Sequence, residues 1–441
     1  MRKVLIISPY FPPIGGSGVF RLHRWVKYLP EFGIQPIVVH YDRLPGEPLD
    51  ESLLKELREE VIRYPVRYIE PSGRGIRALM KKDQAGPGRG APGGETGGGS
   101  GPGVINRLIA GIRDRVLIPD LSAGWIPFVA PALKKIFKAH TPEAIITTSS
   151  PGTPHLLGLW LKRKYQIPWI ADFRDPWTDS PWAAKLAWPF SAMEKRLEKQ
   201  VVREADFITT YSDGLGEMLW RKLGDQKPEK FVSLGPAVDT DKFDQIPVSE
   251  RQYDFLYTGA LEYFHPREIF FALQELNREK RAKGEELLRL GIAGKISLKM
   301  EQFLGQFEKE GWLELLGYLP HQETISLIKS CRILILLHSK QAWWVTGKMA
   351  EYLYSGKPIL AVLGEGEMKS ILKKFGRIVF ALNDQEKISS AIRDTLALKA
   401  EPRALPKELT ARGQSGIIAA LLEKALDPGR GGERISGGKI L

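Results

Sequence analysis

The sequence predicts an α/β protein of two doubly wound domains, each a parallel sheet with helices on both faces. Two observations predict this fold class. The chain has 441 residues, which is more than one hydrophobic core normally organises. Short β-branched runs also alternate with helix-like runs along nearly all of it, as is typical of parallel strands joined by crossover helices.

The expected strands form two series. The first comprises residues 3–9, 35–41, 144–150, 168–173 and 207–212, and the second comprises residues 253–259, 287–294, 312–318, 332–338, 357–362 and 377–382. Apolar residues at helical spacing lie between them, as in residues 19–33 and 266–284. The sequence therefore predicts two αβ domains in series.

The expected first domain covers residues 1–238 and the second covers residues 239–400. The best linker candidate is residues 233–252, which separate the two strand series. Residues 401–441 are expected to supply a terminal helix that packs back toward the first domain, followed by a frayed tail.

A segment without large apolar residues interrupts the first domain. Residues 83–103 are dominated by Gly and Pro, and such a segment cannot bury enough surface to offset its ordering entropy. We expect a disordered insertion. The apolar and arginine pattern of residues 104–118 is compatible with an interfacial membrane helix, but a surface helix packed on its own domain is the preferred interpretation.

Composition limits the cellular setting. Apolar residues make up 43% of the chain and charged residues 26%, and no apolar stretch approaches the ~18 residues that span a bilayer. Proline follows the first apolar run at once, so residues 1–7 are predicted to form a strand and not a signal peptide. With Cys331 as the single cysteine, a cytoplasmic location is expected, and association with the inner face of the membrane stays open.

The net charge of +12 favours acidic partners, such as a nucleotide or an anionic phospholipid. No nucleic-acid-binding module is present, so no nucleic-acid partner is expected. No His/Cys cluster has metal-ligand spacing. Asp239 and Asp241 form an Asp-x-Asp pattern, but they lie in the linker candidate, so no metal site is predicted.

The first candidate site is the loop "SPYFPPIGGSG", residues 8–18. A dinucleotide fingerprint needs G-x-G-x-x-G directly after the strand, and here both spacing and loop length differ. Arg21 lies in the first turn of the following helix, where an anion is normally preferred. Two interpretations stay open: a loop that faces a negatively charged ligand, and a flexible turn with a solvated basic helix.

The second candidate site is the start of a helix within residues 343–362. Thr346 and Gly347 are the expected N-cap and first helical residue, and Lys348 lies in the first turn. Glu351 follows one turn later, where it could accept hydrogen bonds from a ribose whose diphosphate lies at the helix start. A solvated pair between Lys348 and Glu351 is the structural alternative.

With these motifs, the chain resembles the glycosyltransferase family 4 enzymes. "PYFPPIGGSG" resembles their first loop, "YTGAL" the first strand of their donor domain and "TGKMAEYLYSGKPILA" their donor helix. "IPDLSAGW", "TTSSPGTPHLLG" and "PWIADFRDPW" resemble segments of a bacterial surface-polysaccharide subgroup. The resemblance implies the GT-B fold, with two Rossmann-like domains facing each other across a cleft, and sugar transfer with retention of configuration.

The resemblance also implies roles for individual residues. Catalytic roles fall on His155, Gly16, Lys348 and Arg267. Donor binding falls on Gly15, Gly16, Gly259, Thr346, Gly347, Lys348 and Glu351. Four further residues bind the acceptor or shape the first domain, and the two alternatives stay open: Arg21, Asp172, Arg174 and Asp175. In the second alternative, Arg174 is paired between the two carboxylates.

Two positions depart from the family pattern. Trp343 stands where the family has a glutamate before the ribose-binding one, and the usual basic residues of the first donor-domain loop are missing, which leaves Arg267 as the nearest cation. The leading hypothesis is a metal-independent, retaining transferase that uses a nucleoside-diphosphate sugar and a glycan or lipid-linked acceptor, without a further cofactor. The alternatives are a two-domain NAD-dependent oxidoreductase and an inactive sugar-nucleotide-binding protein.

Overall fold

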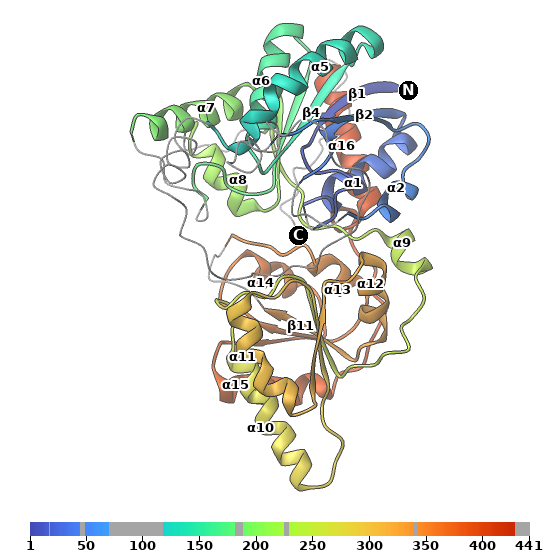
Figure 1. Ribbon diagram of the computed structural model, residues 1–441, viewed down its shortest axis with the longest axis vertical. Coiled ribbons are helices and arrows are strands. Elements are labelled where there is room, and N and C mark those ends of the chain that lie inside the picture. The colour runs from blue at the N-terminus through green and yellow to red at the C-terminus, as the bar shows by residue number, and fades with distance from the viewer. Residues whose placement is uncertain are drawn as a thin grey trace, which may run out of the picture. The chain divides into compact units, whose positions relative to one another are not determined.

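The computed structural model describes residues 1–16, 18–44, 49–69, 118–180, 188–224, 229–337 and 343–427. The chain divides into two compact units (Figure 1). Unit 1 is Met1–Ile208 with Trp220–Gln226 and Leu421–Gly431, and unit 2 is Thr209–Leu219 with Lys227–Ala420 and Gly432–Leu441. The expected α/β fold with two parallel sheets is confirmed.

The first sheet has the strand order β3-β2-β1-β4-β5-β6-β7. Its strands are β1 (Arg2–Ile7), β2 (Ile34–Tyr41), β3 (Ile62–Val66), β4 (Ala144–Ser149), β5 (Trp169–Phe173), β6 (Phe207–Thr210) and β7 (Phe231–Ser233). The central strand β1 runs parallel to both neighbours, with Val4 opposite Pro36 and Ala144. Parallel strands buried on both faces are apolar without alternation, and the "VLII" run of β1 is completely buried.

The helices associated with this sheet follow its strands. They are α1 (Phe20–Tyr28), η1 (Leu29–Phe32), α2 (Ser52–Lys55), η2 (Leu121–Trp125), α5 (Ile126–His140), α6 (Thr153–Tyr165), α7 (Phe190–Glu204) and α8 (Asp213–Trp220). Helix α16 (Ala411–Leu426) comes at the end of the described chain. Gly158 allows α6 to lie close to the sheet, because a Cβ at this position would be only 2.6 Å from Trp169 of β5.

The second sheet has the order β10-β9-β8-β11-β12-β13. Its strands are β8 (Phe255–Thr258), β9 (Leu290–Ala293), β10 (Leu313–Gly317), β11 (Ile333–Leu337), β12 (Ile359–Val362) and β13 (Ile378–Ala381). Successive residues of β11 enter different cores: Ile333 and Ile335 pack into one, and Leu334 into the other. Both faces of the sheet are therefore covered.

Two groups of helices provide that cover (Figure 1). On one face lie α10 (Glu268–Ala282), α11 (Leu298–Lys309) and α15 (Gln385–Leu396), and on the other α12 (His321–Ser330), α13 (Met349–Tyr354) and α14 (Glu367–Leu372). The remaining elements are α9 (Thr240–Gln245) and η3 (Lys407–Leu409).

Both strand series agree with the sequence prediction, but two strands were missed. β3 has Pro65 in its interior, which argues against a strand except at a sheet edge, and β3 is an edge strand. β7 is the opposite edge and has three residues, too few for a pattern. The expected insertion 83–103 and most of segment 104–118 lie outside the described residues.

One local expectation was wrong. Helix α13 begins at Met349 with Lys348 as its N-cap, so Thr346 and Gly347 precede the helix. The linker candidate, residues 233–252, lies between the two strand series and includes the end of β7 and all of α9. Asp239 caps α9 by accepting from the amide of Lys242 at 3.1 Å, and Asp241 forms an ion pair with Arg412. The Asp-x-Asp pattern thus has structural partners.

Candidate functional site

The carboxyl edge of the second sheet carries two closely packed glycines. Gly259 follows β8 and donates to the carbonyl of Ala293 at 2.7 Å, and Gly294 follows β9. Both have positive φ, 103° and 147°, which side chains disfavour. A Cβ at Gly294 would lie 2.1 Å from the Gly259 carbonyl oxygen. The two loops therefore pack their backbones closely at positions that leave no room for a side chain.

Lys348 reaches this edge from the start of α13. Its Nζ lies 3.7 Å from the centre of the Tyr257 ring and would be 3.0 Å from a Cβ at Gly259. Burial lowers the pKa of Lys348 to about 7, because a poorly hydrated ammonium loses its solvation energy. Lys348 thus lies beside Gly259, and a bound anion there would favour protonation of the amine.

Glu351 lies one turn further along α13 and is 7% exposed. Its Oε1 is 2.9 Å from Nε2 of His321, the first residue of α12. The structural alternative, a solvated pair with Lys348, does not describe Glu351, which is buried against His321. No individual role was predicted for His321, which lies in the "GYLPHQE" segment between a strand and a helix.

Arg267 is the N-cap residue of α10, and its side chain contacts aromatic rings. Its guanidinium lies 4.3 Å from the centre of the Tyr263 ring and donates to the Tyr263 hydroxyl at 2.5 Å, and it also lies 5.5 Å from the Phe303 ring. In the same loop, burial lowers the pKa of His265, and the charge of Lys348 adds to this effect. Arg267 thus belongs to an aromatic cluster beside the loop.

The remaining second-unit candidates frame α13. Gly347 is exposed, and a Cβ there would lie 3.2 Å from the hydroxyl of Tyr211. Thr346 accepts from the amide of Met349 at 3.2 Å. Trp343 packs against Gly214 at the start of α8, because its Cβ would be 2.7 Å from a Cβ at that glycine. The tryptophan at the family's glutamate position therefore packs against the backbone of α8.

Glu367, which the sequence did not single out, caps α8. Its two carboxylate oxygens accept from the amides of Asp213 and Gly214 at 2.7 and 2.8 Å. Burial raises the pKa of Glu367, although these amide donors oppose the rise. Gly366 is the N-cap residue of α14, and Glu367 is the first residue of that helix.

In unit 1, the glycine-rich loop is held at its far end. Gly15 is buried, Gly16 has a φ of 96°, and Val19 donates to the Gly16 carbonyl at 3.2 Å. Arg174 donates from Nη1 to the carbonyl of Gly18 at 2.6 Å. The loop is thus tied to the segment that follows β5.

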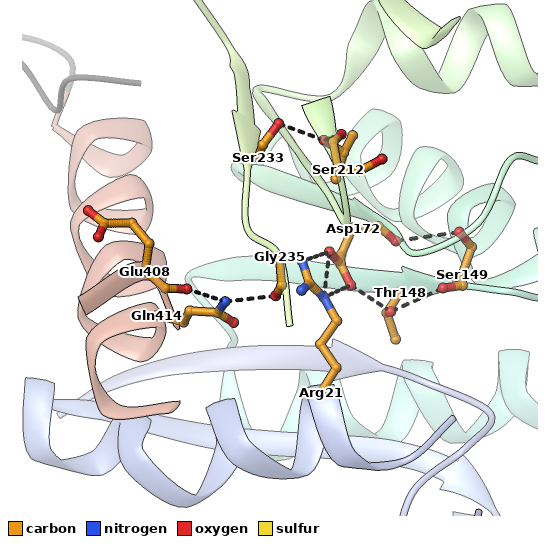
Figure 2. A network of polar contacts seen from close by, with 10 residues as sticks. Arg21, Thr148, Ser149, Asp172, Ser212, Ser233, Gly235, Glu408 and Gln414 are labelled. Carbon is orange, nitrogen blue, oxygen red and sulfur yellow. Dashed lines mark hydrogen bonds and ion pairs between the residues drawn. The ribbon is translucent and has the colours of Figure 1, made fainter. Parts of the chain in front are cut away.

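A buried ion pair lies beside this loop. Arg21 of α1 donates from Nη2 to Oδ1 of Asp172 at 2.8 Å and from Nε to Oδ2 at 3.1 Å. Thr148 donates to the same carboxylate at 2.8 Å, and Figure 2 shows these side chains converging from α1, β4 and β5. The carboxylate of Asp172 therefore supplies the negative charge that was expected beside Arg21 in the first turn of α1.

This geometry corrects the structural alternative for Arg174. The arginine is not paired between two carboxylates: Asp172 is taken by Arg21, and Asp175 receives a 3.4 Å hydrogen bond from Ser150. Among the described residues, the hydrogen bond of Arg174 is made to the Gly18 carbonyl.

Asp120 joins two of the family-like segments. Its carboxylate accepts from the amides of Gly152 and Thr153, at 2.6 and 3.0 Å, and from the Thr153 hydroxyl at 2.7 Å. Burial raises the pKa of Asp120, whereas these donors lower it. The start of α6 is therefore already capped by an acid from "IPDLSAGW". The sequence prediction missed this role, because the two segments are remote in the chain.

His155 lies inside α6 and is fully buried. The centre of its ring is 4.3 Å from that of Phe173, and its Nδ1 is 2.7 Å from the hydroxyl oxygen of Thr147. Burial lowers the pKa of His155 to about 3, so the imidazole is neutral in the physiological range.

The structure thus gathers the predicted residues in two sets. Unit 2 brings together Gly259, Lys348, Glu351 and the additional His321 around the ends of β8 and α13. Unit 1 brings together the glycine loop, Arg21, Asp172 and Arg174. Sugar-nucleotide proteins need both a diphosphate site and a ribose site, and the first set has the residue types for both.

The comparison with protein families gives one match. Residues 91–242 match Glycosyltransferase Family 4. This match supports the resemblance to family 4, and the "IPDLSAGW", "TTSSPGTPHLLG" and "PWIADFRDPW" segments all lie within it. No curated protein matches the chain.

Solved structures of glycosyltransferases share the fold over nearly the whole chain. A glycosyltransferase from Rickettsia africae is 12% identical, with 96% of this chain and 94% of that chain covered and a TM-score of 0.53. WaaG, a glycosyltransferase involved in lipopolysaccharide biosynthesis, is 13% identical, with 97% and 100% covered and a TM-score of 0.50.

Two further solved structures share the fold, and one of them is a UDP-GlcNAc 2-epimerase. MnaA from S. aureus, solved with UDP, is 13% identical, with 97% of each chain covered and a TM-score of 0.52. A UDP-GlcNAc 2-epimerase from Methanocaldococcus jannaschii is 10% identical, with 96% and 99% covered and a TM-score of 0.51. At these identities the likeness establishes the GT-B type of fold, and the family 4 match supports a transferase.

Two features are absent from the described residues. No helix there is long and apolar enough to cross a membrane. No group of three or more His, Cys, Asp or Glu side chains there could hold a metal ion.

Proposed function

We propose that the protein is a retaining glycosyltransferase that moves a sugar from a nucleoside-diphosphate sugar to a glycan or lipid-linked acceptor in surface-polysaccharide synthesis. One observation carries the proposal: at one edge of the second sheet, Lys348 lies beside Gly259, and the buried Glu351 lies one turn further along α13. The Lys348 cation beside the glycine backbone could bind a diphosphate, and the nearby Glu351 carboxylate could accept hydrogen bonds from the hydroxyls of a ribose.

Charge builds up on the leaving diphosphate as the glycosidic bond breaks, so the enzyme must stabilise that charge. Lys348 is assigned this role, because its amine lies over the Tyr257 ring at the ends of the strands. Arg267 is the second proposed cation, and it would have to exchange the Tyr263 ring for the phosphate. Gly259, Gly347 and Thr346 are proposed to line the diphosphate.

Unit 1 is proposed to supply Gly15 and Gly16 against the donor and His155 as a hydrogen-bond donor to the sugar. Gly16 has the positive φ that a close backbone approach commonly needs. Asp175 and the Arg174 segment are proposed to shape the acceptor side, since Arg174 fixes the glycine loop through Gly18.

The test is a donor screen combined with thermal shift. UDP, GDP, ADP and NAD are added to the wild type and to Glu351→Ala, and release of nucleoside diphosphate from sugar donors is measured with acceptor extracts. We expect one nucleoside diphosphate to stabilise the wild type and not the variant. Stabilisation by NAD alone would favour the oxidoreductase and overturn the proposal.

Two other outcomes would also overturn it. Binding without diphosphate release from any donor would indicate an inactive sugar-nucleotide-binding protein. Conversion of the donor sugar without an acceptor would indicate an epimerase.

We also propose that transfer needs no metal ion. Treatment with EDTA followed by dialysis should therefore leave the rate of transfer unchanged. A loss of activity that Mg²⁺ or Mn²⁺ restores would contradict this part of the proposal.

A lipid-linked acceptor would require contact with the membrane surface, and we propose that α7 provides it. Trp188 and Met193 are 83% and 53% exposed at its start. Lys195, Arg196 and Lys199 lie exposed on the following turns. Large apolar side chains next to cations are typical of helices that lie on anionic bilayers.

The acidic residues of α7 are turned to partners within unit 1. Glu194 accepts from the indole of Trp177 at 3.0 Å, Glu198 pairs with Lys222, and Glu204 accepts from Arg163 at 2.9 Å. These contacts leave the exposed face of the helix positively charged. The inner face of a cytoplasmic membrane, which is anionic, is the matching surface.

A further inference from the structure

A chain of two hydrogen bonds ends on the buried imidazole of His155. The indole of Trp169 in β5 donates to the hydroxyl oxygen of Thr147 in β4 at 2.8 Å, and that oxygen lies 2.7 Å from Nδ1 of His155. Thr147 and Trp169, like His155, are 0% exposed. All three side chains are thus held away from bulk water.

Counting protons along this chain fixes the tautomer. An indole N–H can only donate, so the Thr147 oxygen must accept from it. The Thr147 hydroxyl has one proton, and Nδ1 of His155 is the acceptor that the described residues offer it. Thr147 therefore donates to Nδ1. A neutral imidazole that accepts at Nδ1 carries its proton on Nε2.

The Nε2 of His155 is buried and has no hydrogen-bond partner among the described residues. Buried donors without an acceptor are rare in folded proteins and cost stability. Here the rest of the ring is satisfied, and only the N–H produced by the Thr147 contact lacks an acceptor. Such an arrangement suits a donor kept for an oxygen that the described protein does not supply.

Gly158 supports the same arrangement from the opposite side. It lies one turn of α6 after His155, and a Cβ there would be 2.6 Å from Nε1 of Trp169 and 2.8 Å from Cγ2 of Thr147. The indole can reach the threonine only because this position has no side chain. Helix α6 thus accommodates the hydrogen-bond chain on which His155 depends.

We infer that Thr147 and Trp169 are positioning residues that hold His155 as the Nε2–H tautomer, so that it donates to an oxygen of the sugar and does not act as a general base. The role in transfer rests on the proposed function, whereas the tautomer follows from the hydrogen bonds alone.

The experiment is a long-range ¹H–¹⁵N correlation spectrum of the histidine side chains in the full-length protein, with His155→Gln used for assignment. In the wild type, we expect the proton on Nε2. Thr147→Val, which keeps the shape but removes the hydroxyl, should produce a mixture of tautomers and lower kcat/KM about tenfold, the effect of one hydrogen bond. Thr147→Ser should restore both.

Trp169→Phe gives an independent test, because it removes the N–H donor and leaves an aromatic ring; it should also yield mixed tautomers. A wild-type proton on Nδ1, or a spectrum that Thr147→Val leaves unchanged, would overturn the inference. If the spectra are as expected but the protein releases no diphosphate from any donor, the proposed function is overturned. The assignment of the Nε2–H tautomer to His155 is then still supported.

Discussion

The side chain of Asp172 is 0% exposed in the interior of unit 1 and forms an ion pair with Arg21. Hydrogen bonds from the guanidinium and from Thr148 hold the carboxylate. Arg21 is itself buried and also lies 4.4 Å from the centre of the Trp25 ring. Neither member of the pair can be lost without leaving the other as a buried charge.

We predict that Asp172→Ala lowers the free energy of unfolding by about 3–5 kcal/mol, because the buried guanidinium of Arg21 would lose its ion pair with this carboxylate. Urea denaturation would measure the change. Asp175→Ala is the matched control from the same loop and should cost less than about 1 kcal/mol, since its partner is one long bond from Ser150. Equal effects of the two substitutions would contradict a structural role for the pair.

Lys348 should make nucleoside-diphosphate binding depend on pH. Its pKa is lowered to about 7, so the free amine becomes neutral as the pH rises through 7 and must take up a proton to bind a diphosphate. Affinity should therefore fall by up to about tenfold per pH unit above pH 7. Lys348→Arg stays charged and should lose this dependence in calorimetric titrations between pH 6 and 9.

The same lowered pKa affects stability in the opposite direction. Between pH 7 and the pKa of an exposed lysine, near 10.4, the unfolded chain holds a proton that the folded chain lacks. Without ligand, the Lys348 contribution to the free energy of unfolding should therefore rise with pH across this window. A fall that Lys348→Met abolishes would contradict the assigned direction.

At the scale of elements, α12 and α13 meet through the contact of His321 and Glu351. The imidazole contacts Oε1 of the carboxylate and orients the side chain, which is proposed to accept from a ribose hydroxyl. We predict that the wild type binds a nucleoside diphosphate about tenfold more tightly than its 2′- or 3′-deoxy analogue, the value of a hydrogen bond to a charged acceptor.

Glu351→Gln should reduce this discrimination, and His321→Ala should reduce it less, because the carboxylate remains but loses its orientation. Calorimetry with each analogue measures the ratio. Equal discrimination by the wild type and Glu351→Gln would mean that Glu351 does not contact the ribose.

If α7 contacts the membrane, substitutions in α7 should weaken vesicle binding, whereas comparable substitutions in another helix should not. Reversal of three charges, with Lys195, Arg196 and Lys199 changed to Glu, should weaken sedimentation with phosphatidylglycerol vesicles at least tenfold, since each cation contributes about 1 kcal/mol. Trp188→Ala should weaken it independently. Vesicles of phosphatidylcholine should bind neither form strongly.

Helix α5 provides the control. Lys134, Lys135 and Lys138 are also exposed there, but the exposed large apolar residues at the start of α7 have no counterpart beside them among the described residues. Changing these three to Glu should leave vesicle binding largely intact. A similar loss in both triple variants would show that net charge, and not the α7 face, governs binding.

At the scale of the whole molecule, the proposed donor and loop functions belong to different units. Gly16 lies in unit 1, and Lys348 and Glu351 lie in unit 2. A side chain at Gly16, with its φ of 96°, would strain the loop. Gly16→Val should therefore abolish transfer and leave nucleoside-diphosphate affinity within about twofold; equal loss of both would assign the loop to nucleotide binding.

The fold was predictable because each long strand is an apolar run bounded by turn residues, and burial on both sheet faces leaves that run without alternation. The edge strands β3 and β7 were not, since Pro65 and a three-residue length remove the pattern. The start of α13 was misplaced by two residues, because capping depends on backbone geometry that Thr346 and Gly347 do not fix.

The sequence by itself determined the two-sheet architecture, the family 4 motifs and the positions of Lys348 and Glu351, because these depend on local patterns. Tertiary structure alone decided the partners. Asp172 takes Arg21 and not Arg174, and Glu351 takes His321. Thr147 sets the proton of His155. Each contact joins segments remote in the chain, and a charge or proton is placed by whichever group lies within hydrogen-bond distance, which only folding determines.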